Sequence, residues 1–263
     1  MALTLDVITL GAPEVHAART FYGTTFSPAI DDDDGSAHLD LHGAGRLTLT
    51  AADRLAADAG AEPAAPGFRG YVLNYVVDQP TEVKTLMDAA VRSGAKVLKP
   101  AKKILFGAFS GVFLAPDGAV WKLASATAKD TGPAAESPLP TEITLILGVS
   151  APKASRAFYE ALGMSVDRDY GNKYIDFHPA AAATRLCLME RRVLAKDAGT
   201  TEDGDGFPSM ILDHAAGSRE EVDALLSSVA VAGGRITADP AQTSGGYSGS
   251  FTDPDGFRWR VTH

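Results

Sequence analysis

Aspartate and histidine side chains are the groups in this sequence best suited to acid–base chemistry or metal binding. Asp213 is followed directly by His214, and His263 is the last residue. Asp176 precedes His178 by two residues, a spacing that can place both side chains on one face of a strand. Two ligands are too few for a metal centre, so this second pair does not define one.

No familiar catalytic motif accompanies these residues. The sequence contains no HExxH, GxSxG or GxGxxG pattern and no phosphate-binding loop, so hydrolase and nucleotide-binding functions lack support. The single cysteine, Cys187, excludes an intramolecular disulfide and a cysteine cage for a metal. Its apolar neighbours indicate a buried strand thiol rather than a nucleophile.

The composition is that of a folded protein with an acidic surface. Of the 263 residues, 45% are hydrophobic and 22% are charged, which is typical of globular proteins. The net charge of −9 repels phosphate backbones and anionic lipids, so we expect neither nucleic acid nor a membrane as a partner. The sequence has no bilayer-spanning stretch and no N-terminal signal pattern, so we expect a cytoplasmic location.

These residues must be positioned by a duplicated unit, because the sequence repeats itself. Gly11 and Phe21-Tyr22 recur as Gly148 and Phe158-Tyr159, and the turn Pro116-Asp117-Gly118 recurs as Pro254-Asp255-Gly256. The offset stays near 138 residues from the first match to the last. We interpret residues 1–124 and 141–263 as two copies of one module, joined by a linker over 125–140 that is rich in Ala, Pro and small polar residues.

Hydrophobic periodicity predicts two βαβββ units in each copy. In the first copy the first unit has a strand over 4–10, a helix over 13–21 and strands over 26–30, 36–41 and 46–50. The second unit has a strand over 70–77, a helix over 81–93 and strands over 96–98, 109–114 and 120–124. The clearest helices of the second copy cover 152–162 and 218–232, the latter opened by a capping box of Ser218 and Glu221.

The segments 8–22, 147–163 and 246–259 carry these repeated motifs. They resemble the opening strand and helix and the closing hairpin of the glyoxalase/bleomycin resistance/extradiol dioxygenase (vicinal oxygen chelate) superfamily. The resemblance covers nearly all of the chain outside the linker. It implies an α+β fold, a tandem duplication of a glyoxalase-like module in which two βαβββ units form a curved, mostly antiparallel sheet around a cleft.

Metal-dependent members of this family place His, Gln or Glu in the first strand, His at the start of the fifth and Glu in the last. The resemblance puts these positions on Val7, Val72 and Lys122 in the first copy and on Thr144, Ile211 and Arg260 in the second. None of these side chains suits a divalent cation. A register shift would bring in Asp6, Glu142 or Asp213, but no first-strand histidine. We therefore expect neither the family metal site nor a cofactor.

Strand alternation predicts which side chains line the clefts. The candidate ligand-binding residues on these faces are Thr9, Asn74, Lys122, Ile146, Asp213, Arg258 and Arg260. Phe109 and Tyr247 precede Ser-Gly in the two closing hairpins and are either stacking walls of the clefts or ordinary packing residues. Lys122 and Arg260 either form local ion pairs, Arg260 with Asp213, or meet an anionic ligand.

The expected function is binding of a small organic molecule in one or both clefts without a metal, as in the drug-binding members of the family it resembles. The alternative is an enzyme, a lyase, isomerase or dioxygenase, that uses a different metal set or metal-free acid–base chemistry by Asp213 with His214 or His263. A third hypothesis is a structural protein whose clefts are filled by their own side chains. Because the two modules can pair within the chain, we expect a monomer.

Overall fold

The computed structural model describes residues 2–33, 35–63, 67–104, 108–180, 183–204, 206–243 and 245–263. These residues form four βαβββ units, and the last strand of the first and third units leads into an additional helix. The first copy consists of β1 (Val7–Ala12), α1 (Val15–Phe26), β2 (Ala29–Asp33), β3 (Ser36–Asp40), β4 (Arg46–Ala51), α2 (Ala52–Asp58), β5 (Tyr71–Val77), α3 (Pro80–Arg92), β6 (Lys96–Lys103), β7 (Phe109–Leu114) and β8 (Val120–Ser125). The second copy consists of β9 (Glu142–Val149), α4 (Pro152–Ala161), β10 (Val166–Asp169), β11 (Ile175–Phe177), β12 (Arg185–Glu190), α5 (Arg191–Ala198), β13 (Met210–Ala215), α6 (Arg219–Ala232), β14 (Arg235–Thr243), β15 (Gly246–Thr252) and β16 (Arg258–Thr262).

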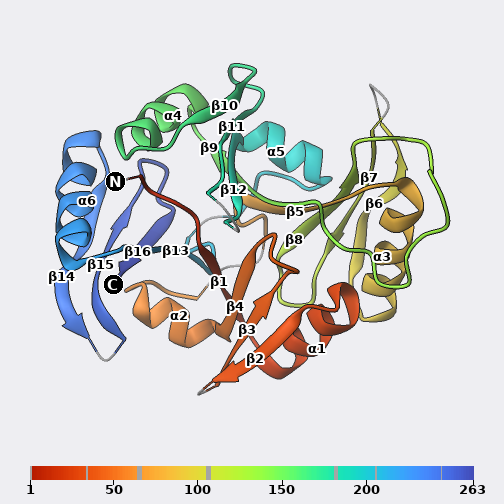
Figure 1. The fold of residues 1–263 in the computed structure, drawn as a ribbon, viewed down its shortest axis with the longest axis horizontal. Coiled ribbons are helices and arrows are strands. Elements are labelled where there is room, and N and C mark those ends of the chain that lie inside the picture. The colour runs from red at the N-terminus through yellow and green to blue at the C-terminus, as the bar shows by residue number, and fades with distance from the viewer. Residues whose placement is uncertain are drawn as a thin grey trace.

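The strands form two eight-stranded sheets, each mostly antiparallel. Sheet A has the order β14-β15-β16-β13-β1-β4-β3-β2, and sheet B has the order β10-β11-β12-β9-β5-β8-β7-β6. In Figure 1 sheet A runs from the left edge of the molecule to the bottom, and sheet B runs from the top to the right. The predicted tandem glyoxalase-like α+β fold is confirmed.

The two βαβββ units of one copy do not share a sheet, contrary to the expectation from the sequence. Sheet A joins the first unit to the fourth through the antiparallel pair β1–β13, in which Val7 lies opposite Asp213. Sheet B joins the second unit to the third through β5–β9, in which Asn74 lies opposite Thr144. Each copy therefore contributes one unit to each sheet, and each cleft contains residues from both copies.

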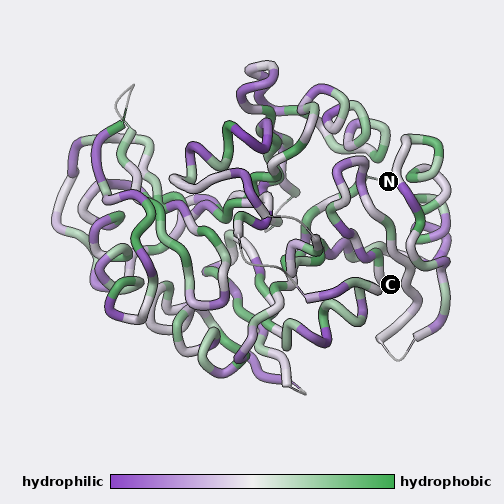
Figure 2. Tube along the Cα trace, turned by 180° about the vertical axis from the view of Figure 1, so that it is seen from behind, coloured by the Kyte–Doolittle hydropathy of each residue, from purple (hydrophilic) through white to green (hydrophobic). Residues whose placement is uncertain are grey.

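The helices of one copy pack together on the sheet faces opposite the clefts, α1 against α3 and α4 against α6. Trp121 is buried there beside Tyr22 and Phe26, and Trp259 is buried in the same way beside Tyr159. The two tryptophans thus point to the helix side. Hydrophobic stretches follow the inner strands and the inward sides of the helices, whereas hydrophilic ones lie mostly at the periphery (Figure 2).

Two local features differ from the sequence prediction. The helix expected over 13–21 spans Val15–Phe26 as α1, so the next strand begins at Ala29 instead of near residue 26. Tyr22 and Phe26 are four residues apart on one helical face and both are buried, which stabilises the additional turn. Two further helices, α2 and α5, cover residues for which no helix was predicted.

Candidate functional site

One line of side chains crosses the cleft face of sheet A from edge to edge. Strand register places these residues level with one another, and we call them the A row. In strand order from β2 to β14 the A row consists of Asp31, His38, Thr48, Thr9, Ile211, Arg258, Thr252 and Arg235. All of these side chains except Ile211 are polar or charged.

A hydrogen-bonded cluster lies at the centre of this cleft, on β1, β13 and β16. Asp213 Oδ2 accepts a hydrogen bond from the Thr9 hydroxyl at 2.6 Å, and Asp213 Oδ1 accepts one from Arg260 Nε at 2.6 Å. Burial raises the pKa of the Asp213 carboxyl, and the charge of Arg260 and the hydrogen bond from Thr9 oppose this shift. Strand alternation predicted that Asp213 and Arg260 share a cleft face but placed Thr9 in the other cleft, and the expected local pair of Arg260 with Asp213 is present.

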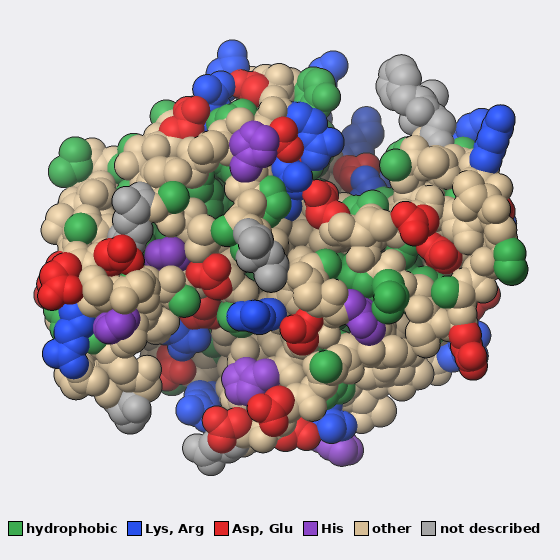
Figure 3. Space-filling model, viewed as in Figure 1, with side chains coloured by type: hydrophobic (Ala, Val, Ile, Leu, Met, Phe, Trp, Pro, Cys, Tyr) green, Lys and Arg blue, Asp and Glu red, His purple; other side chains and the backbone are tan. Residues whose placement is uncertain are grey.

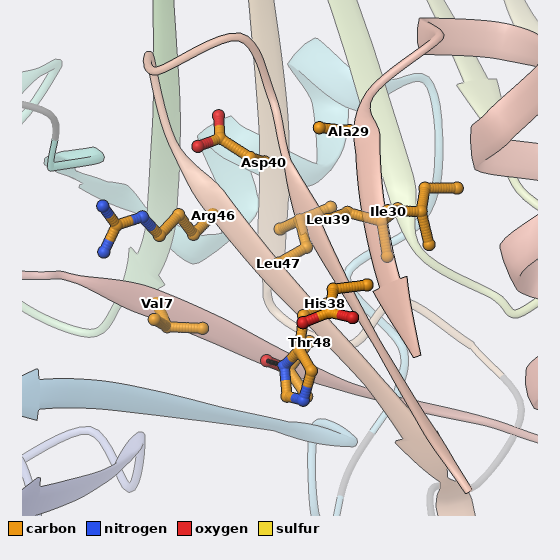
Figure 4. Close-up of a pocket in the computed structure, with 10 residues that line it drawn as sticks. Val7, Ala29, Ile30, His38, Leu39, Asp40, Arg46, Leu47 and Thr48 are labelled. Carbon is orange, nitrogen blue, oxygen red and sulfur yellow. Dashed lines mark hydrogen bonds between the residues drawn. The ribbon is translucent and has the colours of Figure 1, made fainter. Parts of the chain in front are cut away.

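A pocket of about 260 Å³ opens on the same face beside this cluster. Val7 lies on one side of it, and β2, β3 and β4 supply the rest, including His38, Asp40, Arg46 and Thr48 (Figure 4). His38 Nδ1 lies 3.0 Å from the Thr48 hydroxyl. Figure 3 shows the molecule hollowed between the strands β13–β16 and helix α2, with acidic and basic side chains at the walls. The pocket thus combines apolar walls with a few polar groups, as small-molecule sites do.

The six positions to which the family resemblance assigns metal ligands are distributed over both sheets. Val7, Ile211 and Arg260 lie in sheet A, whereas Val72, Lys122 and Thr144 lie in sheet B. These aliphatic, cationic and hydroxyl side chains do not fit a divalent cation that requires imidazole or carboxylate ligands. No group of three His, Cys, Asp or Glu side chains within the described residues is placed to hold a metal ion.

The cleft face of sheet B has a different character at the same positions. We call its level residues the B row, in strand order from β10 to β6, and it consists of Arg168, Asp176, Cys187, Ile146, Val72, Val120, Leu114 and Lys96. The five residues at its centre are apolar, whereas four of the five at the centre of the A row are polar or charged. Helix α5 packs onto this apolar centre and contributes Leu194, Ala195 and Ala198 to the same buried cluster.

Two lysines hold the C-terminal end of α5 against sheet B. Lys99 Nζ donates to the carbonyl oxygens of Lys196 and Asp197 at 2.7 and 2.6 Å, an arrangement that satisfies carbonyls at the end of a helix. Lys122 Nζ forms an ion pair with the Asp197 carboxylate at 2.7 Å. The predicted local pairing of Lys122 is therefore present. Asn74 and Ile146, which were predicted to share a ligand-binding face with the residues now found in sheet A, lie in this second, packed cleft.

Phe109 and Tyr247 do not face the clefts, so their assignment as possible stacking walls is wrong. Phe109 is buried on the helix side, with the Lys84 ammonium 5.5 Å from its ring centroid. The Tyr247 hydroxyl donates to Asp223 of α6 at 2.8 Å. Strand alternation explains the difference, because the following residues, Ser110 and Ser248, are level with the cleft-facing β8 and β16 positions.

The histidines considered for catalysis lie away from Asp213. His214, the next residue along β13, is buried with Nδ1 2.8 Å from the Thr4 hydroxyl and 3.3 Å from Asp6. His263 Nδ1 lies 3.3 Å from the Ala216 carbonyl oxygen. His178 is exposed beside Asp167, whereas Asp176 is fully buried. The structure therefore does not assemble the proposed acid–base pair of Asp213 with either His214 or His263.

Comparison with known proteins agrees with this architecture. The model of the Glyoxalase/Bleomycin resistance protein/Dioxygenase superfamily matches residues 143–261, the second copy of the repeat. A search of curated proteins finds no match. No helix among the described residues is long and apolar enough to cross a membrane.

Solved structures with the same two-module arrangement extend the likeness to the whole chain. Glyoxalase I from Zea mays is 18% identical, with a TM-score of 0.64 and coverage of 99% of this chain and 92% of that one. A putative dioxygenase from Bacillus subtilis is 15% identical, with a TM-score of 0.62 and coverage of 99% and 86%. At these identities the likeness shows the fold alone. The family match itself covers the second copy, and the internal repeat relates the first copy to it.

Proposed function

We propose that the protein binds a small organic molecule in the cleft of sheet A without a metal ion, and that the cleft of sheet B serves as core. The observation that carries this proposal is the contrast between the polar A row beside a pocket of about 260 Å³ and the apolar B row beneath α5. A buried apolar cluster stabilises a fold but leaves no room for a ligand. A partly open face whose polar groups can still form hydrogen bonds is able to bind a ligand. Sequestration of a drug-like compound is the role that best suits binding without turnover.

A blocking substitution tests this proposal. Thr48 is half-buried at the pocket, so Thr48→Phe should fill the space that a ligand needs. Lys173→Phe adds a similar ring at an exposed site and serves as the matched control. We expect compounds that raise the melting temperature of the chelator-treated wild type to have the same effect on Lys173→Phe and none on Thr48→Phe. Equal stabilisation of all three proteins would place the binding elsewhere, and loss of all stabilisation by chelator would contradict metal-free binding.

The second candidate is an enzyme of the same superfamily, favoured by the raised pKa of the buried Asp213 carboxyl in the cleft. In this case Asp213 would donate or accept a proton as a general acid or base, and the hydrogen bond from Arg260 would hold its carboxyl group in place. Elemental analysis of protein purified without chelator separates the metal-dependent form of this hypothesis from simple binding. A stoichiometric transition metal that is required for turnover would favour the enzyme over our proposal.

A further inference from the structure

Two arginines without acidic partners lie at the β14 end of the A row. Arg258, Thr252 and Arg235 are level with one another on the neighbouring strands β16, β15 and β14. Arg258 is half-buried and Arg235 is exposed at the edge strand. Neither guanidinium forms an ion pair with a carboxylate among the described residues. The positive charge at this end of the cleft is therefore not balanced by the described part of the chain.

Two other cations that face the clefts have carboxylate partners. Arg260, two residues from Arg258 on the same strand, pairs with Asp213 at 2.6 Å. Lys122, the repeat equivalent of Arg260, pairs with Asp197 at 2.7 Å. A lack of acidic groups therefore does not account for the missing partner, in a chain with a net charge of −9.

This arrangement costs stability in the free protein. Burial, and then the nearby positive charge of Arg235, lower the pKa of the Arg258 guanidinium. The repeat equivalents of Arg258 and Thr252 are Val120 and Leu114 in sheet B, so the fold itself does not require a cation at this position. A ligand that neutralises the two arginines would explain why they are present.

The surroundings of Arg258 indicate the chemistry of such a ligand. Two guanidinium groups flank a threonine hydroxyl, so this corner presents many hydrogen-bond donors and no negative charge. Such a surface suits a carboxylate or another oxyanion. On its other side Arg258 lies level with Ile211, whose buried apolar cluster packs against the half-buried Phe207. The corner therefore fits a molecule with an anionic group next to an apolar body.

We propose that the cleft of sheet A selects organic anions, and that Arg258 with Arg235 binds the oxyanion of the ligand. This inference rests on the proposed binding function, because it assigns a ligand class to the same cleft. Long-range repulsion by the acidic chain lowers the rate of encounter with an anion but does not remove this local site, because charges beyond about 10 Å are screened at physiological salt.

Matched acid and amide probes test the selection. Benzoate, 2-naphthoate and octanoate would each be compared with the corresponding primary amide by ligand-observed NMR titration. The variants are Arg258→Gln and Arg235→Gln, and the control is Lys96→Gln, which removes the same charge at the repeat-equivalent edge position of sheet B. We expect the wild type and Lys96→Gln to prefer the acids about tenfold. Arg258→Gln should abolish the preference and leave amide binding within about twofold, and Arg235→Gln should reduce the preference partially.

The outcomes separate the two proposals. Binding of amides as tight as that of acids in the wild type would overturn the anion selection and leave the binding function standing. A preference that survives in both arginine variants would overturn the assignment of Arg258 and Arg235. No binding of any probe by the wild type would count against both proposals. Arg258→Gln should also melt at or above the wild-type temperature, because it relieves an unpaired charge, whereas an arginine needed for packing would lower it.

Discussion

At the scale of single residues the cleft of sheet A is organised around one carboxylate and its partners. Arg260 in the last strand is neutralised by Asp213 on the adjacent strand β13. Thr9 completes the cluster from the other copy. The centre of the cleft thus contains a carboxylate–guanidinium pair that is closed within the protein itself.

The Asp213–Arg260 pair should be energetically coupled. The Arg260 side chain is 36% exposed and that of Asp213 is 12% exposed, so removal of either partner leaves a half-buried charge. We expect Asp213→Asn to lower the free energy of unfolding by about 1–2 kcal/mol. The double variant with Arg260→Gln should recover part of the loss. Urea denaturation of the four proteins measures the coupling. The exposed pair Arg19–Asp32 is the reference cycle and should show little or no coupling, because solvent screens it.

A second residue-scale prediction concerns pH. Asp253 is buried at the turn before β16 and accepts a hydrogen bond from the Tyr159 hydroxyl at 2.7 Å. Burial raises the pKa of this carboxyl to about 7. Because the folded-state pKa lies above the unfolded one, its favourable contribution is complete below about pH 4 and is lost as the pH rises through 7.

Asp253→Asn should therefore differ from the wild type in its pH profile. We expect the stability of the wild type relative to this variant to fall by a few kcal/mol between pH 4 and 7 and then to level off. Thermal melts over this range would measure the difference. Asp88→Asn, at an exposed helix position, is the control and should follow the wild type. A relative stability that rises with pH would contradict the direction of the shift.

At the scale of elements, α5 closes the second cleft. Leu194 is fully buried in the cluster that includes Ile146 and Val72. We expect Leu194→Ala to cost about 2–5 kcal/mol, because the rigid sheet beneath it cannot collapse into the space left behind. Leu139→Ala, at a leucine that is 56% exposed, is the matched control and should cost little. Equal costs in chemical denaturation would show that α5 is not an integral part of the core.

The sequence carried enough information to predict most of the repeated elements, but not to predict which face of an element every side chain occupies. The capping box was predicted from Ser218 and Glu221, and Ser218 Oγ does accept a hydrogen bond from the Glu221 amide at 3.2 Å. The helix α5 went unrecognised although Leu194, Ala195 and Ala198 repeat at helical spacing before Gly199, which ends it in a left-handed conformation. Phe109 and Tyr247 were misplaced because a shift of one residue reverses the face of a strand.

At the scale of the whole molecule, the exchange of units between copies could not be predicted from the repeat. The β1 and β13 strands begin equivalent units, so a first strand can in principle pair with the one in its own copy or with the one in the other. The choice depends on lateral contacts between strands that are about 200 residues apart, such as Ile8 opposite Leu212. Sequence periodicity contains no information about that choice. The consequence is that Thr9 from one copy and Asp213 from the other build a single site.

This exchange predicts how the chain behaves when it is cut. Residues 1–132 alone would leave the pairing edges of β1 and β5 unsatisfied, and residues 133–263 would leave those of β9 and β13. We expect each half to dimerise or aggregate by itself, and the two halves to form a soluble one-to-one complex when they are expressed together. The intact chain should sediment as a monomer, because both pairings are made internally. Halves that remain monomeric and fully folded in isolation would contradict the role of β1–β13 and β5–β9 pairing. A stable dimer of the intact chain would show that a further surface joins two molecules.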